Sequence, residues 1–255
     1  MTGKRKAESM RLDGMIAVIT GGTRGLGRAI AERYLAEGAS VVCAARNPCD
    51  IHELIGRHPE RVIYQETDVS DEASVTRLFD RAVSEFRRVD VLVANAGISR
   101  NATIRRLSLV DWNATIATNL TGVFLCTRAA AKVMEPQGSG RVITVSSCVA
   151  SRAAVGTAAY SASKAAVEMF TRCAAVEFAP KGIAVNCLAP GYIDEGMGRR
   201  LANSKVWATY EPRLLSRRLG HADELAAAAV FLASPDSSYV NGHVLEVNGG
   251  LLWAA

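Results

Sequence analysis

A tyrosine and a lysine four residues apart, in Tyr160-Ser-Ala-Ser-Lys164, are the side chains best placed to do chemistry. On a helix this spacing puts the phenol and the ammonium on one face. A free phenol, with a pKa of roughly 10, is a poor acid–base group at neutral pH, but a neighbouring cation stabilises the phenolate and lowers that pKa. Ser147 closes a preceding strand, and its hydroxyl can point into the crevice at the carboxyl edge of a sheet. An exposed surface pair is the alternative for Tyr160 and Lys164 taken alone.

A glycine-rich turn, Thr20-Gly-Gly-Thr-Arg-Gly-Leu-Gly27, follows an apolar strand and opens a helix. Backbone amides at a helix N-terminus face an anion, and glycines let a pyrophosphate approach the main chain closely. The glycines fall at Gly21, Gly25 and Gly27, which is not the commoner G-x-G-x-x-G spacing. We expect the turn to bind the phosphates of a dinucleotide, and a plain strand-to-helix connection is the alternative.

The end of the second strand discriminates between the two nicotinamide cofactors. A carboxylate there binds ribose hydroxyls, whereas a 2′-phosphate needs cations. Arg46 occupies this place after Ala45, and Arg24 lies in the glycine turn. Arginine binds phosphate through paired hydrogen bonds, so the sequence predicts NADP(H) rather than NAD(H), with a solvated Arg46 as the alternative. The nearest acid, Asp50, is expected to cap a short helix, with Glu53 completing a capping box.

Hydrophobic periodicity predicts the elements that position these residues. Short apolar runs predict strands at residues 15–20, 40–45, 61–65, 89–94, 141–146, 183–188 and 243–247. Helical spacing predicts helices at residues 26–37, 71–86, 111–134, 157–178 and 222–233, the third ending before Pro136. Strands that are apolar almost throughout, with helices between them, are typical of a parallel sheet buried on both faces. We predict a single-domain α/β fold, a doubly wound, Rossmann-type parallel sheet of about seven strands with helices on both faces.

The remaining segments are predicted from their length and composition. Residues 1–10 are expected to be a disordered basic tail, and residues 11–255 one dinucleotide-binding catalytic domain without internal linkers. Residues 191–220 follow a strand end, and such a long segment is either disordered or a lid over a site. Its apolar side chains could form a wall for a bulky, flat substrate or could pack the lid on the body. The predicted substrate contacts are Tyr192, Met197, Trp207 and Tyr210.

The composition excludes several functional classes. In 255 residues, 49% are hydrophobic and 22% are charged, the mix of a globular protein rather than a disordered chain. No apolar run reaches the length of about eighteen residues that a membrane helix needs, and no secretory signal is present, so we expect a cytoplasmic protein without a membrane partner. The net charge of +5 comes from cations scattered among acids, so no nucleic-acid partner is predicted. The six cysteines lack metal-site spacing, so we expect reduced thiols and no metal.

Taken jointly, the motifs resemble those of the short-chain dehydrogenase/reductase family over residues 12–250, almost the whole chain. The glycine turn, Asn95-Ala-Gly97 after the fourth strand and Pro190-Gly191 at a later strand end follow the family's order. Four positions match the catalytic tetrad in order and spacing: Asn119, Ser147, Tyr160 and Lys164. The joint pattern is far more specific than any one motif.

The resemblance implies roles for these side chains. Tyr160 would donate a proton to a carbonyl oxygen as the nicotinamide supplies hydride, and Ser147 would hydrogen-bond the same oxygen. Lys164 would bind the nicotinamide ribose and lower the pKa of Tyr160, and Asn119 would hold a water that links Lys164 to solvent. The implied cofactor contacts are Gly21, Thr23, Arg24, Gly25, Leu26, Gly27, Arg46, Asp68, Val69, Asn95, Ala96, Gly97, Tyr160, Lys164, Pro190, Gly191 and Ile193. Without the resemblance, Asp68 could equally be a strand-end cap and Asn95 a turn residue.

Residues 218–220, 231–234 and 247–250 resemble the family branch that contains 3-oxoacyl-carrier-protein reductases and free-standing polyketide ketoreductases. Carrier-protein enzymes often have an arginine where Val176 precedes Glu177, and that arginine helps to dock the acidic carrier. The resemblance therefore implies an NADPH-dependent ketoreductase that makes a secondary alcohol, with a polycyclic aromatic polyketide of an angucycline-type antibiotic pathway as the first hypothesis. The alternatives are a 3-oxoacyl-carrier-protein reductase and a catalytically idle NADP(H)-sensing regulator. The family also implies a homotetramer or a homodimer.

Overall fold

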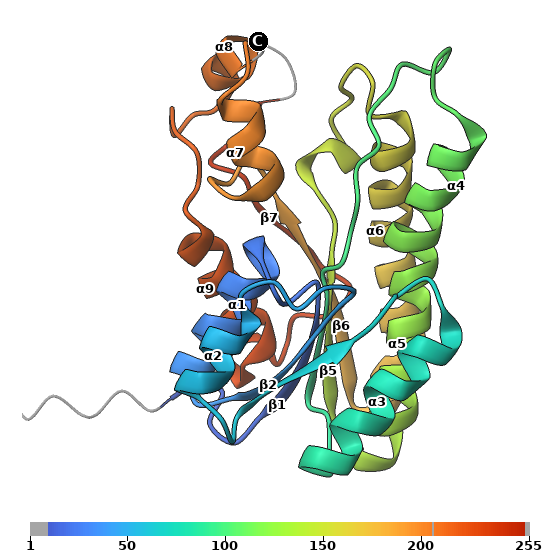
Figure 1. The fold of residues 1–255 in the computed structure, drawn as a ribbon, viewed down its shortest axis with the longest axis vertical. Helices are drawn as coiled ribbons and strands as arrows, with labels where there is room; N and C mark the ends of the chain where they lie inside the picture. Colours follow the sequence, from blue (N-terminus) through green and yellow to red (C-terminus); the bar gives the residue numbers. More distant parts are fainter. Residues whose placement is uncertain (1–9, 206, 253–255) are drawn as a thin grey trace, which may run out of the picture.

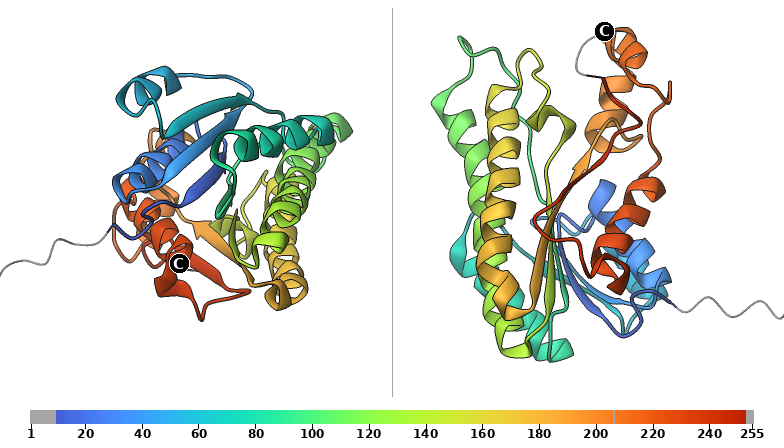
Figure 2. Two further views of the ribbon diagram at one scale, coloured as in Figure 1. Left: turned by 90° about the horizontal axis from the view of Figure 1, so that it is seen from below. Right: turned by 180° about the vertical axis from the view of Figure 1, so that it is seen from behind.

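The architecture is one parallel sheet between two layers of helices. The computed structural model describes residues 10–205 and 207–252. Over these residues seven strands pair in the order β3-β2-β1-β4-β5-β6-β7, all parallel. Helices α1, α2 and α9 cover one face, and α3, α5 and α6 cover the other (Figure 1, Figure 2). The predicted doubly wound parallel sheet is confirmed.

The strands lie close to the predicted positions because those inside the sheet are apolar along nearly their whole length and are buried on both faces, while the two edge strands are only partly buried. They are β1 (Ile16–Thr20), β2 (Ser40–Ala45), β3 (Val62–Glu66), β4 (Val91–Ala94), β5 (Gly140–Val145), β6 (Ile183–Pro190) and β7 (Val244–Val247). β6 runs two residues further than predicted, since β7 pairs with residues 187–190. Its end therefore lies beside the last strand of the sheet.

The helices pack their apolar sides on the sheet and expose their charged sides. They are α1 (Gly25–Ala36), α2 (Ile51–Arg57), α3 (Glu72–Phe86), α4 (Leu109–Ile116), α5 (Gly122–Gln137), α6 (Ala158–Phe178), α7 (Gly196–Ala202), α8 (Trp207–Tyr210) and α9 (Ala222–Ala233). Within the described parts of the chain, none of them combines the length and apolar character that crossing a membrane requires.

The single helix predicted over residues 111–134 is wrong in three respects. It begins earlier, at Leu109, because the Ser108 side chain accepts a hydrogen bond from the Asp111 amide. It is divided into α4 and α5 by a π-helical turn, Ala117–Thr121. It continues through Pro136, which lies in its last turn, and it ends at Gly138, whose φ of 67° is the left-handed conformation of a helix C-terminus.

The capping box predicted from Asp50 and Glu53 is also wrong. α2 begins directly after Asp50, but the Asp50 side chain accepts no hydrogen bond from the first turn. Its φ of −91° and ψ of 20° differ from the extended conformation that lets a cap reach the amides of the first turn. Asp71, before α3, has that extended conformation and accepts bonds from the amides of Ala73 and Ser74.

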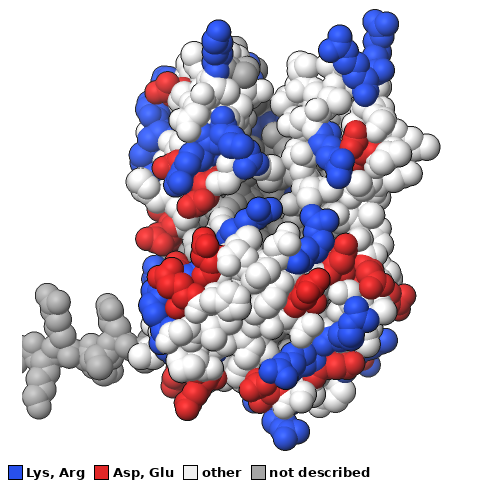
Figure 3. Space-filling view, viewed as in Figure 1, with Lys and Arg blue, Asp and Glu red and all other residues white. Residues whose placement is uncertain are grey.

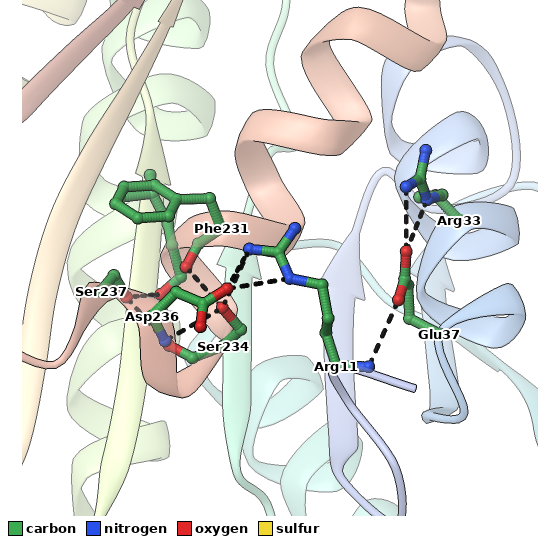
Figure 4. Close-up of polar contacts among 8 residues, drawn as sticks. Arg11, Arg33, Glu37, Phe231, Ser234, Asp236 and Ser237 are labelled. Carbon is green, nitrogen blue, oxygen red and sulfur yellow. Dashed lines mark hydrogen bonds and ion pairs between the residues drawn. The ribbon is translucent and has the colours of Figure 1, made fainter. Parts of the chain in front are cut away.

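The start of the described chain is fastened to the ends of two helices. The Arg11 amide donates to a Glu37 carboxylate oxygen at 3.3 Å, and Arg33 donates to the other oxygen of the same carboxylate at 2.9 Å. The Arg11 guanidinium reaches Asp236, just beyond α9, with Nε to Oδ2 at 3.0 Å. Figure 4 shows both contacts radiating from Arg11. Of the predicted tail, only Met10 falls within the described residues, and it is exposed.

Residues 191–220 lie above the carboxyl edge of the sheet, where α7 and α8 stand at the upper end of the molecule (Figure 1). α8 continues into a 3-10 turn, Glu211–Arg213. Short bridges fasten the segment at both ends: Ile193 pairs with Gly220, and Leu214 pairs with Leu251. We call residues 191–220 the lid segment.

Candidate active site

Tyr160 and Lys164 occupy the first two turns of α6 and face each other. The Lys164 Nζ lies 5.7 Å from the centre of the Tyr160 ring. Lys164 is only 3% exposed, and its ammonium donates to the carbonyl of Val145, the last residue of β5, at 2.7 Å. The structure thus brings the pair together on one helix face, as the spacing predicts, and the lysine is buried rather than solvated.

Ser147 lies two residues beyond β5 in an extended conformation, with φ of −167°. Its hydroxyl forms a hydrogen bond with the Tyr160 phenol. A strand end and a helix N-terminus therefore deliver a hydroxyl, a phenol and an ammonium to the same place. These groups meet at the carboxyl edge of the sheet, where open α/β folds bind their ligands.

Burial dominates the acid–base behaviour of this cluster. Burial raises the pKa of Tyr160 to about 12, and the hydrogen bond with Ser147 opposes this only in part. Burial also lowers the pKa of Lys164 to about 8. The pKa of Tyr160 is therefore raised rather than lowered as expected, because removing the phenolate from water outweighs its hydrogen bond with Ser147. Tyr160 is a protonated phenol at neutral pH, and Lys164 is largely an ammonium.

Asn119 lies in the π-helical turn between α4 and α5 and is fully buried. Its Oδ1 accepts from the Ile98 amide at 2.8 Å, and its Nδ2 donates to the Ile98 carbonyl at 2.9 Å and to the Ser163 hydroxyl at 3.0 Å. A methyl group built on Gly97 would lie 3.4 Å from Asn119 Oδ1 and 3.5 Å from Lys164 Nζ. Asn119 therefore lies close to the lysine and ties the chain after β4 to α6.

The glycine turn leaves the main chain open at the start of α1. Gly21 and Gly25 have φ values of 67° and 57°, in the left-handed region. A methyl group on Gly27 would collide with the Gly21 carbonyl oxygen, whereas one on Gly25 would point into open space. The turn thus pairs close packing on one side with exposed backbone on the other, which fits a pyrophosphate on the helix N-terminus.

The other predicted residues of this turn support or flank it. Arg24 is exposed and stands at the N-cap position of α1. Thr23 is 3% exposed, and its hydroxyl donates to the Asn47 carbonyl at 3.1 Å. Leu26 is half-buried against the core beneath α1 and α9. Arg24 therefore places a positive charge at the turn, and Thr23 and Leu26 hold the turn in place.

Thr20, which the sequence analysis did not single out, joins the turn to the end of β4. Its Oγ1 accepts hydrogen bonds from the amides of Asn95 and Ala96, each at 3.0 Å. The Asn95 side chain donates back to the Thr20 carbonyl at 2.9 Å. Asn95 and Ala96 therefore hold β1 and β4 together at the site, and the place of Thr20 at the head of the glycine motif was the signal available in the sequence.

A hollow of about 510 Å³ opens beside the ends of β2 and β3. Arg46 is exposed there and has no carboxylate within ion-pair distance among the residues the structure describes. Asp68 lines the same hollow and accepts from the Ser70 amide at 2.9 Å and the Ser70 hydroxyl at 2.6 Å. These bonds, and then the charge of Arg46, lower the pKa of Asp68. Val69 packs on Gly122, so the walls of this hollow are fixed by neighbouring helices.

The end of β6 completes the carboxyl edge of the sheet. Pro190 is buried, and the Gly191 amide donates to the Val247 carbonyl at 2.9 Å. A methyl group on Gly191 would strike the backbone of Asn248, so the chain can turn here only with glycine. Ile193, near the start of the lid segment, is buried, with 4% exposure.

Three of the four predicted substrate contacts meet in the lid segment. The Tyr192 ring lies edge-on to Trp207, with ring centres 5.9 Å apart, and to Tyr210, at 5.4 Å. Tyr192 and Trp207 pack on a small cluster that includes Cys148, which follows Ser147 in the sequence. Met197 is 44% exposed and lies outside that cluster.

Two arginines near these rings were not singled out from the sequence. Arg152 pairs with Glu246 at 2.9 Å and donates to the Leu251 carbonyl at 3.1 Å. Arg213 stacks over Tyr210, with Cζ 5.7 Å from the ring centre. Arg213 lies in the lid segment and Arg152 between β5 and α6, and neither stretch has a clear periodicity from which these positions could have been predicted.

A parallel sheet of this order, a glycine turn at the first strand end and a serine–tyrosine–lysine cluster define a nucleotide-dependent oxidoreductase. Comparison with known proteins agrees. A family model described as Enoyl-(Acyl carrier protein) reductase matches residues 21–252. The 3-oxoacyl-[acyl-carrier-protein] reductase FabG of Escherichia coli is 38% identical over 245 residues, which cover 95% of this chain and 99% of that protein. The chain belongs to the short-chain dehydrogenase/reductase family and is an NAD(P)-dependent oxidoreductase.

Other relatives extend the range of chemistry. The cis-4-hydroxycyclohexanecarboxylate dehydrogenase of Sinomonas cyclohexanicum is 41% identical over 238 residues, which cover 92% of this chain and 95% of that protein. The crystal structure of a gluconate 5-dehydrogenase from Burkholderia cenocepacia, in complex with NADP and tartrate, superposes with a TM-score of 0.90 at 36% identity, covering 97% of this chain and 99% of that one. The NADP in that structure agrees with the cofactor predicted from Arg24 and Arg46.

Proposed function

We propose that this chain is an NADP(H)-dependent ketoreductase that reduces a ketone to a secondary alcohol. The observation that carries the proposal is the meeting of Ser147, Tyr160 and Lys164 at the carboxyl edge of the sheet, with a phenol whose pKa is raised to about 12. Such a phenol holds its proton at neutral pH and is a donor for an oxygen that gains negative charge. When bound, NADP(H) supplies the hydride.

Each side chain of the cluster has a separate task in this proposal. Tyr160 donates its proton to the carbonyl oxygen of the substrate, and Ser147 donates a hydrogen bond to the same oxygen. Lys164, held by Val145, places a positive charge beneath the phenol and favours the phenolate that remains after the proton has left. Asn119 is a positioning residue, because its bonds go to Ile98 and Ser163.

The cofactor would be held along the same edge. The open side of the Gly21–Gly27 turn suits the pyrophosphate, and Arg46 and Arg24 suit the 2′-phosphate because both are exposed cations at the end of β2 and the start of α1. Asp68, Val69 and residues 95–97 line the adenosine side. Pro190, Gly191 and Ile193 border the nicotinamide side.

The first substrate class we propose is a 3-oxoacyl thioester, as in the FabG relatives. A polycyclic aromatic ketone is the second candidate, and the aromatic cluster of Tyr192, Trp207 and Tyr210 favours it. These rings also contact one another, so part of their role is to pack the lid segment. The relatives compared here act on acyl chains, sugars and single rings, which is why the thioester is placed first.

The test is a matrix of two cofactors and three ketones. The full chain is assayed with NADPH and NADH on an acetoacetyl carrier-protein thioester, on 4-oxocyclohexanecarboxylate and on a polycyclic quinone. We expect NADPH oxidation with a preference over NADH, and the highest kcat/KM on the thioester. Absence of NADPH oxidation with every ketone would overturn the proposal, and a preference for the quinone would promote the second candidate.

The cofactor preference has its own variant. Arg46→Gln should raise the KM for NADPH about tenfold and leave the KM for NADH unchanged, since only NADPH carries the 2′-phosphate. Arg172→Gln, an exposed arginine on α6 far from the end of β2, is the matched control and should change neither value. Equal effects of Arg46→Gln on both cofactors would remove Arg46 from the phosphate site.

We also propose a homotetramer built on α4, α5 and α6. Large apolar side chains stand exposed on these helices, among them Leu109 at 72%, Val110 at 75%, Met169 at 58% and Val176 at 78%. Exposed apolar faces of this kind are typical of protein interfaces. Light scattering of the purified chain, with Val176→Asp as the disrupting variant, tests the proposal: a monomeric wild type would contradict it.

A further inference from the structure

Arg213 is an arginine without an acidic partner in a partly buried place. Its Nε is buried and has no hydrogen-bond partner among the described residues. No carboxylate of residues 10–205 or 207–252 lies within ion-pair distance of it. A buried donor that lacks a partner costs free energy, and a guanidinium costs more than a neutral group. Such a group therefore calls for an acceptor that binds there.

The position of Arg213 is fixed by its backbone rather than by its side chain. Its carbonyl accepts from the Leu252 amide at 2.9 Å, and the next residue, Leu214, is 1% exposed and paired with Leu251. The guanidinium stacks over the Tyr210 ring. The chain thus holds the cation in place without neutralising it.

The site lies next to the catalytic cluster. The charge of Arg213 acts on the Tyr192 phenol, and so do Arg152 and Cys148, which follows Ser147 in sequence. Tyr192 packs with Cys148, so the Tyr192 side chain links Arg213 to the chain segment that carries Ser147. Of the two arginines, Arg152 is paired with Glu246, which leaves the charge of Arg213 in excess.

The surroundings carry more positive than negative charge. Figure 3 shows Lys and Arg, with some Asp and Glu among them, on both sides of the hollow at the upper end of the molecule, where the lid segment faces the chain that precedes α4 (Figure 1). Exposed cations without an ion pair among the described residues include Arg105 and Arg106 before α4 and Arg200, Lys205 and Arg217 in the lid segment, whose acids are Asp194, Glu195 and Glu211. An excess of cations around an opening raises the local concentration of anionic ligands.

We infer that the substrate carries an anionic oxygen group, a carboxylate or a phosphate, and that Arg213 binds it from the lid segment while the ketone lies at Tyr160. Arginine suits this role because its planar fork matches two oxygens of either group. The inference rests on the proposed ketoreductase function and names the substrate class of the same site. A residue of the lid segment therefore sets specificity, and the sheet edge carries out the chemistry.

The test compares probes that differ only in charge. The first pair is 4-oxocyclohexanecarboxylate and its neutral carboxamide; the second pair is acetoacetyl-CoA, which carries phosphates, and the acetoacetyl thioester of N-acetylcysteamine, which does not. In the wild type we expect a higher kcat/KM for the charged member of one pair. Arg213→Gln should reduce that preference about 10- to 100-fold, the range of a charge-assisted hydrogen bond, and leave the neutral member nearly unchanged. The pair that loses its preference identifies the anion as carboxylate or phosphate.

Arg172→Gln is the matched control, because Arg172 is an exposed arginine on α6, outside both the lid segment and the chain that precedes α4, and should leave both preferences intact. Arg213→Lys keeps the charge but not the fork, and should retain part of the preference. If Arg213→Gln lowers kcat/KM equally for charged and neutral probes, Arg213 only supports the lid segment and the inference is overturned. The same holds if the wild type shows no preference in either pair.

A binding measurement separates this inference from the proposed function. Calorimetric titration of cyclohexanecarboxylate and of inorganic phosphate into the chain with NADP⁺ requires no turnover. Binding that Arg213→Gln weakens about tenfold supports the anion site even if no ketone is reduced. Reduction of neutral ketones without binding of either anion keeps the ketoreductase and rejects the anion site.

Discussion

The edge of the sheet and the lid segment differ in how their polar groups are held. At the edge, Lys164 and Asn119 are buried, and the hydrogen bonds of these two side chains go to the main chain or to a buried hydroxyl. In the lid segment, Arg199 is exposed and pairs with Asp194 and Glu195 a few residues away. The edge is therefore tied to the whole sheet, whereas these ion pairs of the lid segment join only residues that are close in sequence.

This difference assigns the two regions different tasks. Proton transfer requires atoms that stay within hydrogen-bond reach, and rigid elements hold them there. Substrate entry requires a segment that can open without unfolding the domain, and segments with few buried contacts have the lowest local stability. Changes at the edge should therefore alter the chemical step and stability, and changes in the lid segment should alter substrate affinity.

The largest effect should come from Lys164→Met, which is expected to lower kcat about 10³-fold because the charge beneath the phenol is lost. The same variant has a signature in stability. The pKa of Lys164 falls from 10.5 to about 8 on folding. Between these pH values the unfolded chain keeps a proton that the folded chain has lost, so this lysine makes the free energy of unfolding rise with pH, by ~3 kcal/mol in total.

Denaturant titrations at a series of pH values measure that slope in the wild type and in Lys164→Met. The buried thiols Cys43, Cys126 and Cys148 act in the opposite direction above pH 9, since burial raises the pKa of each. They are present in both proteins, so the difference between the two curves isolates the lysine. Parallel curves would contradict the buried ammonium.

Gly27→Ala tests how tightly the phosphate turn is packed. The added methyl group would meet the Gly21 carbonyl oxygen, which is main chain and cannot move aside, so we expect a loss of about 3 kcal/mol of stability. Gly25→Ala is the control for steric crowding, because its methyl group meets open space, and its cost should come only from the φ of 57°. Equal stability of Gly27→Ala and the wild type would show that the turn is looser than described.

Trp207→Ala should change affinity more than stability. The ring packs on Tyr192 in a small cluster that can separate from the body, so we expect the KM for the ketone to rise about tenfold and the free energy of unfolding to fall by only about 1 kcal/mol. Steady-state kinetics and urea denaturation measure the two quantities. A large loss of kcat at unchanged KM would show that the Trp207 ring takes part in the chemical step. It would contradict the division of tasks between the sheet edge and the lid segment.

The smallest effect is expected from Arg199→Ala. The guanidinium and its partners Asp194 and Glu195 are exposed, and exposed ion pairs contribute little to stability because water and salt screen them. No change in Tm should be measurable at physiological salt. A clear drop in Tm would show that the lid segment is tied to the body more strongly than its contacts indicate.

Much of the fold could be predicted because its signals are local. The apolar runs of residues 40–45 and 183–188 leave no exposed face, and only strands of a covered parallel sheet are buried in that way. The π-helical turn at Ala117–Thr121 left no such signal, because one extra residue in a helical turn does not alter the hydrophobic pattern visibly. The predicted cap at Asp50 was wrong because its backbone conformation is unsuitable, although its side chain is of a suitable type.

In the active site too, the features with a local sequence signal could be predicted and the others could not. Ser147, Tyr160 and Lys164 were found because their identities and spacing carry the chemistry. The direction of the pKa of Tyr160 was mistaken because it depends on how much of the phenol is removed from water, which spacing does not reveal. Thr20 and Arg213 matter through contacts between segments far apart in the chain, and these contacts exist only in the folded molecule.

Single-turnover reduction by Tyr160→Phe tests most directly whether Tyr160 is the proton donor. The variant removes only the phenol oxygen, so the chain should fold and bind NADPH as the wild type does. With NADPH bound and the ketone in excess, loss of NADPH fluorescence should be about 10³-fold slower than in the wild type, because the phenol that would protonate the carbonyl oxygen is gone. A rate within about threefold of the wild type would contradict Tyr160 as the proton donor and would favour another mechanism or an idle NADP(H)-sensing role.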